Sequence, residues 1–134
     1  MARNLKLSNL AANAQANALA ALLNNGYLRF YNGTQPATAD TPLSGQTMLA
    51  EPRFGSPAFA PASGGVLLAN DITADSDAAA SGTASWFRCF SSDGVTAILD
   101  GSIGTSGCDI NMPTTDIVQH AVVPVTSLSY TVTK

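Results

Sequence analysis

TASWFRCF-SSDG-VTAIL, residues 83–99, is the stretch that decides the fold of this chain. Ser, Asp and Gly at 91–94 separate two runs of strand-forming residues, which predicts a β-hairpin. Strand alternation sends Trp86, Arg88 and Phe90 to one face and Phe87 and Cys89 to the other. Because both faces carry bulky groups, we expect this first strand to be central and buried on both sides.

Similar short runs continue on both sides of the hairpin, separated by Gly, Pro, Asp and Ser. Strands are expected at Tyr27 to Tyr31, Thr47 to Phe54, Ser56 to Ala60, Val66 to Ala69, Val118 to Val123 and Val125 to Thr133. Pro52 indicates an edge or a bulge. In the last run, Thr126, Leu128, Tyr130 and Val132 alternate with polar residues, as in a sheet with one wet face. Gly101, Gly104 and Gly107 predict a loose loop. Seven or eight such strands predict a mainly β fold: an antiparallel sandwich, jelly roll or barrel-like domain.

One helix is expected near the N-terminus, from Asn9 to Asn24. Ser8 is a suitable N-cap, and Asn25-Gly26 tolerates the left-handed conformation at a helix end. Its apolar stripe is formed by Leu7, Leu10, Ala14, Ala18 and Leu22, and is widened by Ala11, Leu19 and Leu23. Asn13, Gln15, Asn17 and Asn24 lie mainly on other faces. The stripe either covers part of the chain's own sheet or docks on a neighbouring subunit, and the sequence leaves both open.

With 134 residues, the chain is expected to form a single β-rich domain, 1–134. It divides into an N-terminal arm at 1–8, the helix at 9–25 and β-sheets at 27–133. Only 11% of residues are charged and the net charge is −3. Because nucleic-acid binding needs clustered Lys and Arg, and the six basic residues are dispersed, we expect no direct nucleic-acid binding. Arg3 and Lys6, the only close pair, are either solvated or touch an acidic partner or nucleic acid.

No apolar run approaches the length of a membrane span. The apolar run near the N-terminus resembles a signal peptide, but Asn9, Asn13, Gln15 and Asn17 interrupt it. We therefore expect that the protein is made in the cytoplasm and that it does not associate with a membrane.

Few side chains are suited to chemistry, and we expect no catalytic, cofactor-binding or metal site. Asp71, Asp75 and Asp77 form the nearest approach to a calcium cluster, but their spacing does not match an EF-hand. The only histidine, His120, stands on a strand-like run without a Gly-x-Ser-x-Gly elbow. The glycines at 101, 104 and 107 are followed by no Lys, so they do not form a phosphate loop.

Three further residue types have alternative roles. Cys89 and Cys108 form a disulfide only if their strands are neighbours; otherwise they are two free thiols. Trp86 and Tyr27 either pack in the core or stack on a ligand. The enzyme class is thus disfavoured, whereas a surface that works through shape and association fits the composition.

Several segments together resemble a family of small virion structural proteins of tailed bacteriophages and prophages. They are LLNNGYLRFYNGTQP (22–36), LAEPRFGSPAF (49–59), ITADSDA (72–78), GTASWFR (82–88), DGSIGTSG (100–107) and VTSLSYTV (125–132). The resemblance covers nearly the whole chain, although Cys89 and Cys108 stand where the family pattern has small apolar residues. These segments bear the fold and carry no catalytic motif.

The resemblance implies a capsid decoration or cement protein on the capsid exterior of the virion. Its expected partners are the major capsid protein and itself, as a homo-oligomer, dimer or trimer. The alternative is a neck or tail connector or a tail component of the virion. A further alternative is a carbohydrate- or calcium-binding module. The candidate contact regions are the N-terminal arm with the helix at Asn9 to Asn24, and the proline-bearing segment from Glu51 to Pro61.

Overall fold

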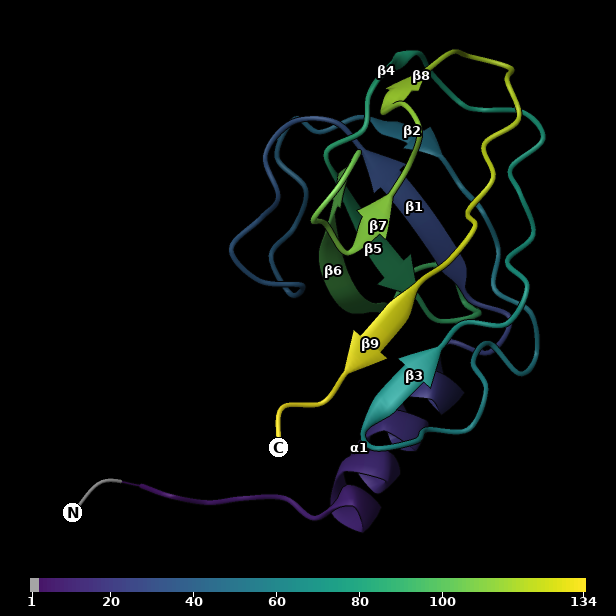
Figure 1. Ribbon diagram of the computed structural model, residues 1–134. Coiled ribbons are helices and arrows are strands. Elements are labelled where there is room, and N and C mark those ends of the chain that lie inside the picture. The colour runs from purple at the N-terminus through teal and green to yellow at the C-terminus, as the bar shows by residue number, and fades with distance from the viewer. Residues whose placement is uncertain (1–2) are drawn as a thin grey trace.

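The computed structural model describes residues 3–134, and strands dominate it (Figure 1). A single helix, α1 (Asn9–Leu22), precedes the strands, which confirms the mainly β class with one N-terminal helix. Five strands form a curled sheet like half a barrel, in the order β2-β1-β5-β6-β7, and two pairs, β3-β9 and β4-β8, complete the fold. The strands are β1 (Tyr27–Tyr31), β2 (Met48–Ala50), β3 (Val66–Leu68), β4 (Gly82–Thr83), β5 (Trp86–Phe90), β6 (Ala97–Gly104), β7 (Ile110–Asn111), β8 (Asp116–Ile117) and β9 (Ser129–Thr131).

β5 is the central strand of the sheet, as its sequence predicts. It pairs antiparallel with β1 on one side and with β6 on the other, and every residue from Trp86 to Phe90 is buried. The predicted hairpin between β5 and β6 is therefore confirmed. Asp93 holds its turn by accepting hydrogen bonds from the backbone N–H groups of Val95 and Thr96.

The loop predicted at Gly101, Gly104 and Gly107 is wrong for its first two glycines, which belong to β6. Gly101 lies opposite Phe87, and a Cβ at Gly101 would come within 2.3 Å of the Phe87 ring. Glycine is therefore what lets the ring of Phe87 lie across β6, and the strand continues through it. Only Gly107 lies in the turn that leads to β7.

The strand predicted at Val118 to Val123 is also wrong, because the chain forms a turn there. The N–H of Ala121 bonds to the carbonyl of Val118, and His120 has a φ of 70°. Two backbone hydrogen bonds to Ala78 hold this turn. The N–H of His120 donates to the carbonyl of Ala78, and the N–H of Ala78 donates to the carbonyl of Ala121. Tertiary bonding therefore overrides the strand propensity of the valines.

The two other long predicted strands are shorter in the structure. Val125 to Thr133 is β-structure only in β9. Leu128 and Val132, which flank β9, are buried as predicted, but Thr126 and Tyr130 are exposed. Thr47 to Phe54 keeps only β2, which is an edge strand, consistent with the expectation from Pro52. No strand forms at Ser56 to Ala60, where only Phe59 makes a bridge, to Ala69.

The ends of α1 follow the predicted capping, with a small shift. The Ser8 hydroxyl accepts a hydrogen bond from the N–H of Ala11, and the helix ends at Leu22, two residues before the predicted Asn24. Asn25 has a φ of 57°, the left-handed conformation expected at the end of the helix. Among residues 3–134, no helix is long and apolar enough to cross a membrane.

Candidate interaction surfaces

The face of α1 that packs on the body is not the stripe expected from the sequence. Ala12 and Ala16 are completely buried, and α1 packs on β3. Leu10 is 82% exposed and Leu22 is 54% exposed, and Ala14 and Ala18 between them are also exposed. Four members of the predicted apolar stripe thus face solvent, whereas Leu7, Leu19 and Leu23 pack in or on the core.

Asparagines explain this orientation. Asn13, Asn17 and Asn24 accept hydrogen bonds from the backbone N–H groups of Gly65, Ala62 and Ala58, respectively, at 2.7, 2.9 and 2.8 Å. These three donors lie in the irregular segment before β3 and have no backbone acceptor within the described chain, so the polar side of the helix must face the body. The helix is therefore unusual. Asparagine side chains and small alanines face the body, and the larger apolar side chains of Leu10 and Leu22 face solvent.

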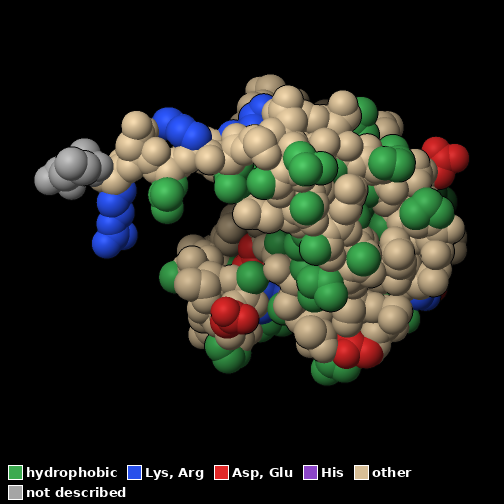
Figure 2. All heavy atoms as spheres, turned by 90° about the horizontal axis from the view of Figure 1, so that it is seen from below, with side chains coloured by type: hydrophobic (Ala, Val, Ile, Leu, Met, Phe, Trp, Pro, Cys, Tyr) green, Lys and Arg blue, Asp and Glu red, His purple; other side chains and the backbone are tan. Residues whose placement is uncertain are grey.

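Residues 3–6 of the arm project from the body (Figures 1 and 2), whereas Leu7 is half-buried and packs on the core. Leu5 is 94% exposed, and no hydrogen bond of residues 3–7 to the rest of the described chain is present. Two of the six basic residues, Arg3 and Lys6, lie here, and none of the nine acidic ones. The arm and the outer face of α1 together form the exposed surface proposed from the sequence.

The second predicted contact region, Glu51 to Pro61, is largely internal. Its buried members are Pro52, Phe54, Ala58 and Phe59, and Phe54 lies against Phe59 with ring centroids 5.7 Å apart. Only Ser56, Pro57 and Pro61 are exposed. The region is therefore mostly core, with a narrow exposed strip.

The acidic residues at 71, 75 and 77 do not converge on a common point. Asp75 accepts hydrogen bonds from the N–H groups of Glu51 and Asp77, and Asp77 contacts His120. In the described range, 3–134, no group of three or more His, Cys, Asp and Glu residues could hold a metal ion. Asp75 instead fixes the backbone of two segments.

His120 is exposed, and among residues 3–134 its side chain hydrogen-bonds to Asp77 alone. Its Nδ1 lies 2.6 Å from Oδ1 of Asp77, and both side chains are more than 70% exposed. Within the described part of the chain, no Ser or Cys side chain hydrogen-bonds to the His120 ring. The two residues form a surface pair that clamps the turn at 118–121.

Both candidate stacking residues are occupied by other contacts. Trp86 is completely buried, stacks on Tyr31 with centroids 4.6 Å apart and donates from Nε1 to the carbonyl of Asn32. The guanidinium of Arg53 lies 3.9 Å from the centroid of the Tyr27 ring. The ring of Trp86 is therefore closed to a carbohydrate, and one face of Tyr27 is covered.

Cys89 and Cys108 are free thiols. Cys89 lies in β5, where burial raises the pKa of its thiol far above the ordinary value, so it stays protonated and packs as an apolar group. Cys108 is half-buried near Gly104. The alternative of a disulfide is thus not realised.

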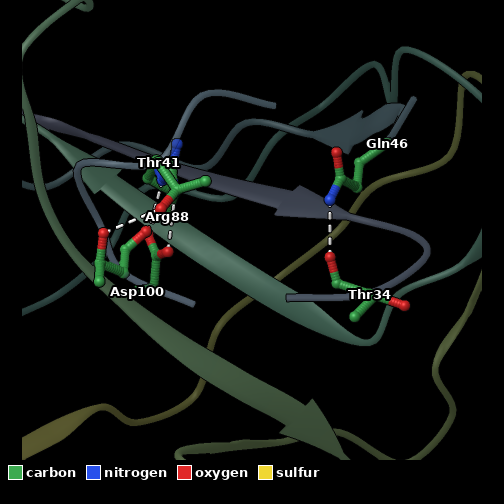
Figure 3. Close-up of polar contacts among 6 residues, drawn as sticks. Thr34, Thr41, Gln46, Arg88 and Asp100 are labelled. Carbon is green, nitrogen blue, oxygen red and sulfur yellow. Dashed lines mark hydrogen bonds and ion pairs between the residues drawn. The ribbon is translucent and has the colours of Figure 1, made fainter. Parts of the chain in front are cut away.

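The sequence reading missed a buried ion pair between Arg88 and Asp100 (Figure 3). Arg88 donates from Nε and Nη2 to the two oxygens of Asp100 at 2.6 and 2.9 Å, and both side chains are 5% exposed. These hydrogen bonds raise the pKa of the Arg88 guanidinium. Nη2 also donates to the carbonyl of Thr38, at 3.3 Å, so the pair anchors the long loop between β1 and β2. The sequence did contain a signal for this pair: Arg88 lies in a strand predicted to be buried on both sides, and a buried charge requires a partner of opposite charge.

Two of the open grooves on the surface have large side chains in their lining. One, of about 300 Å³, is mainly apolar and lies between residues 110–118 and 121–126. The other, of about 450 Å³, lies between β6 and β9 and has Asp100, Asp109, Leu99 and Leu128 in its lining. We call this second groove the β6–β9 cleft.

No protein-family model, no curated protein and no solved structure matches this chain. The resemblance to small phage virion proteins therefore remains a prediction.

Proposed function

We propose that this chain is a structural protein of a bacteriophage virion, and that it acts as a capsid decoration or cement protein on the major capsid protein shell. The observation that carries the proposal is the exposed surface formed by the arm and the outer face of α1. This surface offers Leu5, Leu10 and Leu22 to a partner, whereas soluble domains generally bury such side chains on their own core.

The chemistry of this surface suits repeated, close contacts. α1 carries no charged side chain from Asn9 to Leu22, so it can approach a neighbour without desolvating an ion. Its exposed alanines allow a short distance between helix axis and partner. On a symmetric shell, contacts of this kind are weak individually and are multiplied by the number of copies.

The decisive experiment is the copy number of the protein relative to the major capsid protein in purified virions, by quantitative mass spectrometry. A ratio near that of the shell protein supports decoration. A few copies per particle place the protein in the neck or tail, and absence from the virion contradicts both roles.

A binding assay then tests the surface itself. Deletion of residues 1–6 is expected to weaken binding to purified shells while circular dichroism and the melting temperature stay unchanged, because residues 3–6 make no hydrogen bond to the body and Leu5 is 94% exposed. Leu7 and Ser8 are kept, since Leu7 packs on the core and Ser8 caps α1. The matched pair Leu22→Ser and Leu68→Ser separates the helix face from general surface hydrophobicity, since the two leucines are 54% and 60% exposed but lie on different elements. Only Leu22→Ser is expected to bind the shell less well than the unaltered chain. If Leu22→Ser, Leu68→Ser and the deletion variant all bind as well as the unaltered chain, the proposed surface is contradicted.

A further inference from the structure

The curled sheet is left open along the β6–β9 cleft, and two strand edges face it. β9 pairs only with β3, and β6 pairs with β7 only through Ile103 and Gly104. The outer edge of β6 from Ala97 to Gly101 is thus joined to no strand of the described chain, and the N–H of Ser102 donates to the Asp109 carboxylate. Exposed strand edges are templates for pairing with a further strand.

The direction of the unused backbone groups of β9 follows from its ladder. The carbonyl of Leu128 accepts from the N–H of Ala69, and the N–H of Val132 donates to the carbonyl of Gly65, so both residues are directed toward β3. Alternation then directs the N–H and C=O groups of Ser129 and Thr131 away from β3. No hydrogen bond occupies these groups in the described range.

The arm of the same chain has the properties of a strand that would fill this cleft. Residues 3–7, Arg-Asn-Leu-Lys-Leu, are not helical and lack hydrogen bonds to the body. With a period of two, Leu5 and Leu7 point one way and Asn4 and Lys6 the other. Leu7 already packs on the core of its own chain, so Leu5 is the leucine that the arm offers. The cleft supplies Leu99, Phe59 and Leu128 for Leu5. It also supplies Asp109 for a basic side chain of the arm, because Asp109 accepts hydrogen bonds from Ser102 but has no ion-pair partner among the described residues.

We propose that residues 3–7 of one copy insert as an added β-strand into the β6–β9 cleft of a second copy. The arm donates backbone hydrogen bonds to the outer edge of β9, and Leu5 packs in the cleft, which is a form of β-augmentation. Figure 2 shows the arm projecting from the body beside a hollow that contains acidic side chains. The projection of the arm away from its own body favours exchange between copies. A reciprocal exchange gives a two-fold dimer, and a one-way exchange from copy to copy gives a ring or an open chain.

This association is independent of any capsid shell and is measured in its absence. Sedimentation velocity of the purified full-length chain over a range of concentrations is expected to show a reversible oligomer. Leu5→Ser removes the apolar anchor without touching the folded body, because Leu5 is 94% exposed. It is expected to weaken association roughly 10- to 100-fold, the loss for one leucine side chain that becomes buried. Leu10→Ser, at an 82% exposed position outside the arm, is the control and is expected to associate as the unaltered chain does.

The cleft is tested from the other side by Thr131→Pro, which removes an outward N–H but no hydrogen bond to β3. Thr131→Ala keeps this N–H and is its control. The decisive measurement is a mixture: Leu5→Ser supplies an intact cleft, and Thr131→Pro supplies an intact arm. Each alone is expected to be monomeric, and the mixture to form a 1:1 complex and nothing larger.

Three results would overturn the proposal. The first is an unaltered chain that is monomeric at every concentration, which includes the case in which the arm fills the cleft of its own chain. The second is a Leu5→Ser variant that associates as tightly as Leu10→Ser. The third is a mixture that stays monomeric although Thr131→Pro has the circular dichroism of the unaltered chain. None of these results bears on the copy number in the virion, so the two proposals fail separately.

Discussion

Arg88 and Asp100 show how strongly a single residue pair can constrain this fold. A charged pair in the sheet interior is tolerated because the bidentate geometry satisfies both partners. Removing one partner leaves the other as an uncompensated buried charge.

We predict that Arg88→Met destabilises the protein by about 3–5 kcal/mol, measured by urea unfolding. The double variant Arg88→Met/Asp100→Leu is expected to regain much of this free energy, since no charge then remains buried. Arg29→Met is the control, because it breaks the half-exposed pair between Arg29 and Glu51 and is expected to cost about 1 kcal/mol. An equal loss in the two single variants would contradict a special role for the buried pair.

Asp93 gives the hairpin turn a dependence on pH. Hydrogen bonds from the Thr96 hydroxyl, the N–H groups of Thr96 and Val95, and the Ser91 hydroxyl hold the pKa of the Asp93 carboxyl well below its usual range. Because the folded-state pKa is depressed, the stabilisation is complete above the unfolded pKa of about 3.9 and is lost as the pH falls from there toward the folded value.

We therefore predict that Asp93→Asn lowers the free energy of unfolding at pH 7, and that its difference from the unaltered chain shrinks as the pH falls below about 4. Urea unfolding at several pH values measures this difference. Asp71→Asn, at an exposed position without such bonds, is the control. A difference that stays constant down to the lowest accessible pH would show that the carboxylate charge is not what holds the turn.

At the scale of the element, α1 is positioned by its asparagines as much as by its apolar side chains. Helical periodicity predicted its existence and its N-cap, because these depend on local sequence. It could not predict which face is buried, because alanine occurs on every side of the helix. The deciding bonds go to N–H groups of residues 58–65, more than 30 residues away along the chain.

We predict that Asn13→Ala destabilises the protein by about 1–3 kcal/mol, because it leaves the N–H of Gly65 without its acceptor in a buried place. Gln15→Ala, at an exposed position of the same helix, is the control and is expected to be neutral. Thermal unfolding followed by circular dichroism compares the two. Similar effects of both substitutions would mean that only helix propensity had changed.

The same contrast between local and distant information applies to the strands. β5 was predictable, since bulky residues on both of its faces leave no solvent side. The first part of β6 was predicted with the hairpin, but its continuation to Gly104 was not, because Gly101 interrupts the pattern of apolar residues and is required by the ring of Phe87 in the neighbouring strand. The turn at His120 escaped prediction for a similar reason: its bonds go to Ala78. Likewise the pairing of Arg88 with Asp100 depends on strand register, which the hairpin signal alone leaves open.

For the whole molecule, stability is unevenly distributed. The strands β1, β5 and β6 form one continuous ladder with a buried centre, whereas β3 and β9 form a separate pair at the open side. Regions with few buried contacts open locally at lower free energy than the core.

We predict that in full-length Leu5→Ser, where the arm is disabled, amide hydrogens of β5 exchange with solvent most slowly and those of β9 much faster. Native-state hydrogen exchange followed by nuclear magnetic resonance measures both. In the unaltered chain, the Ser129 and Thr131 amides are expected to slow while those of β4 do not. Uniform protection of β5 and β9 in the variant would contradict this division of the fold.

The bonds from the helix asparagines to the N–H groups of Ala58, Ala62 and Gly65 also have an evolutionary consequence. They recognise the main chain, which every residue except proline supplies, and not the side chains. At half-buried Ala62, drift in residue identity is therefore compatible with the bond, whereas Asn17 is constrained by it. Comparison of diverging lineages should thus find a conserved row of helix asparagines opposite a segment whose exposed positions vary.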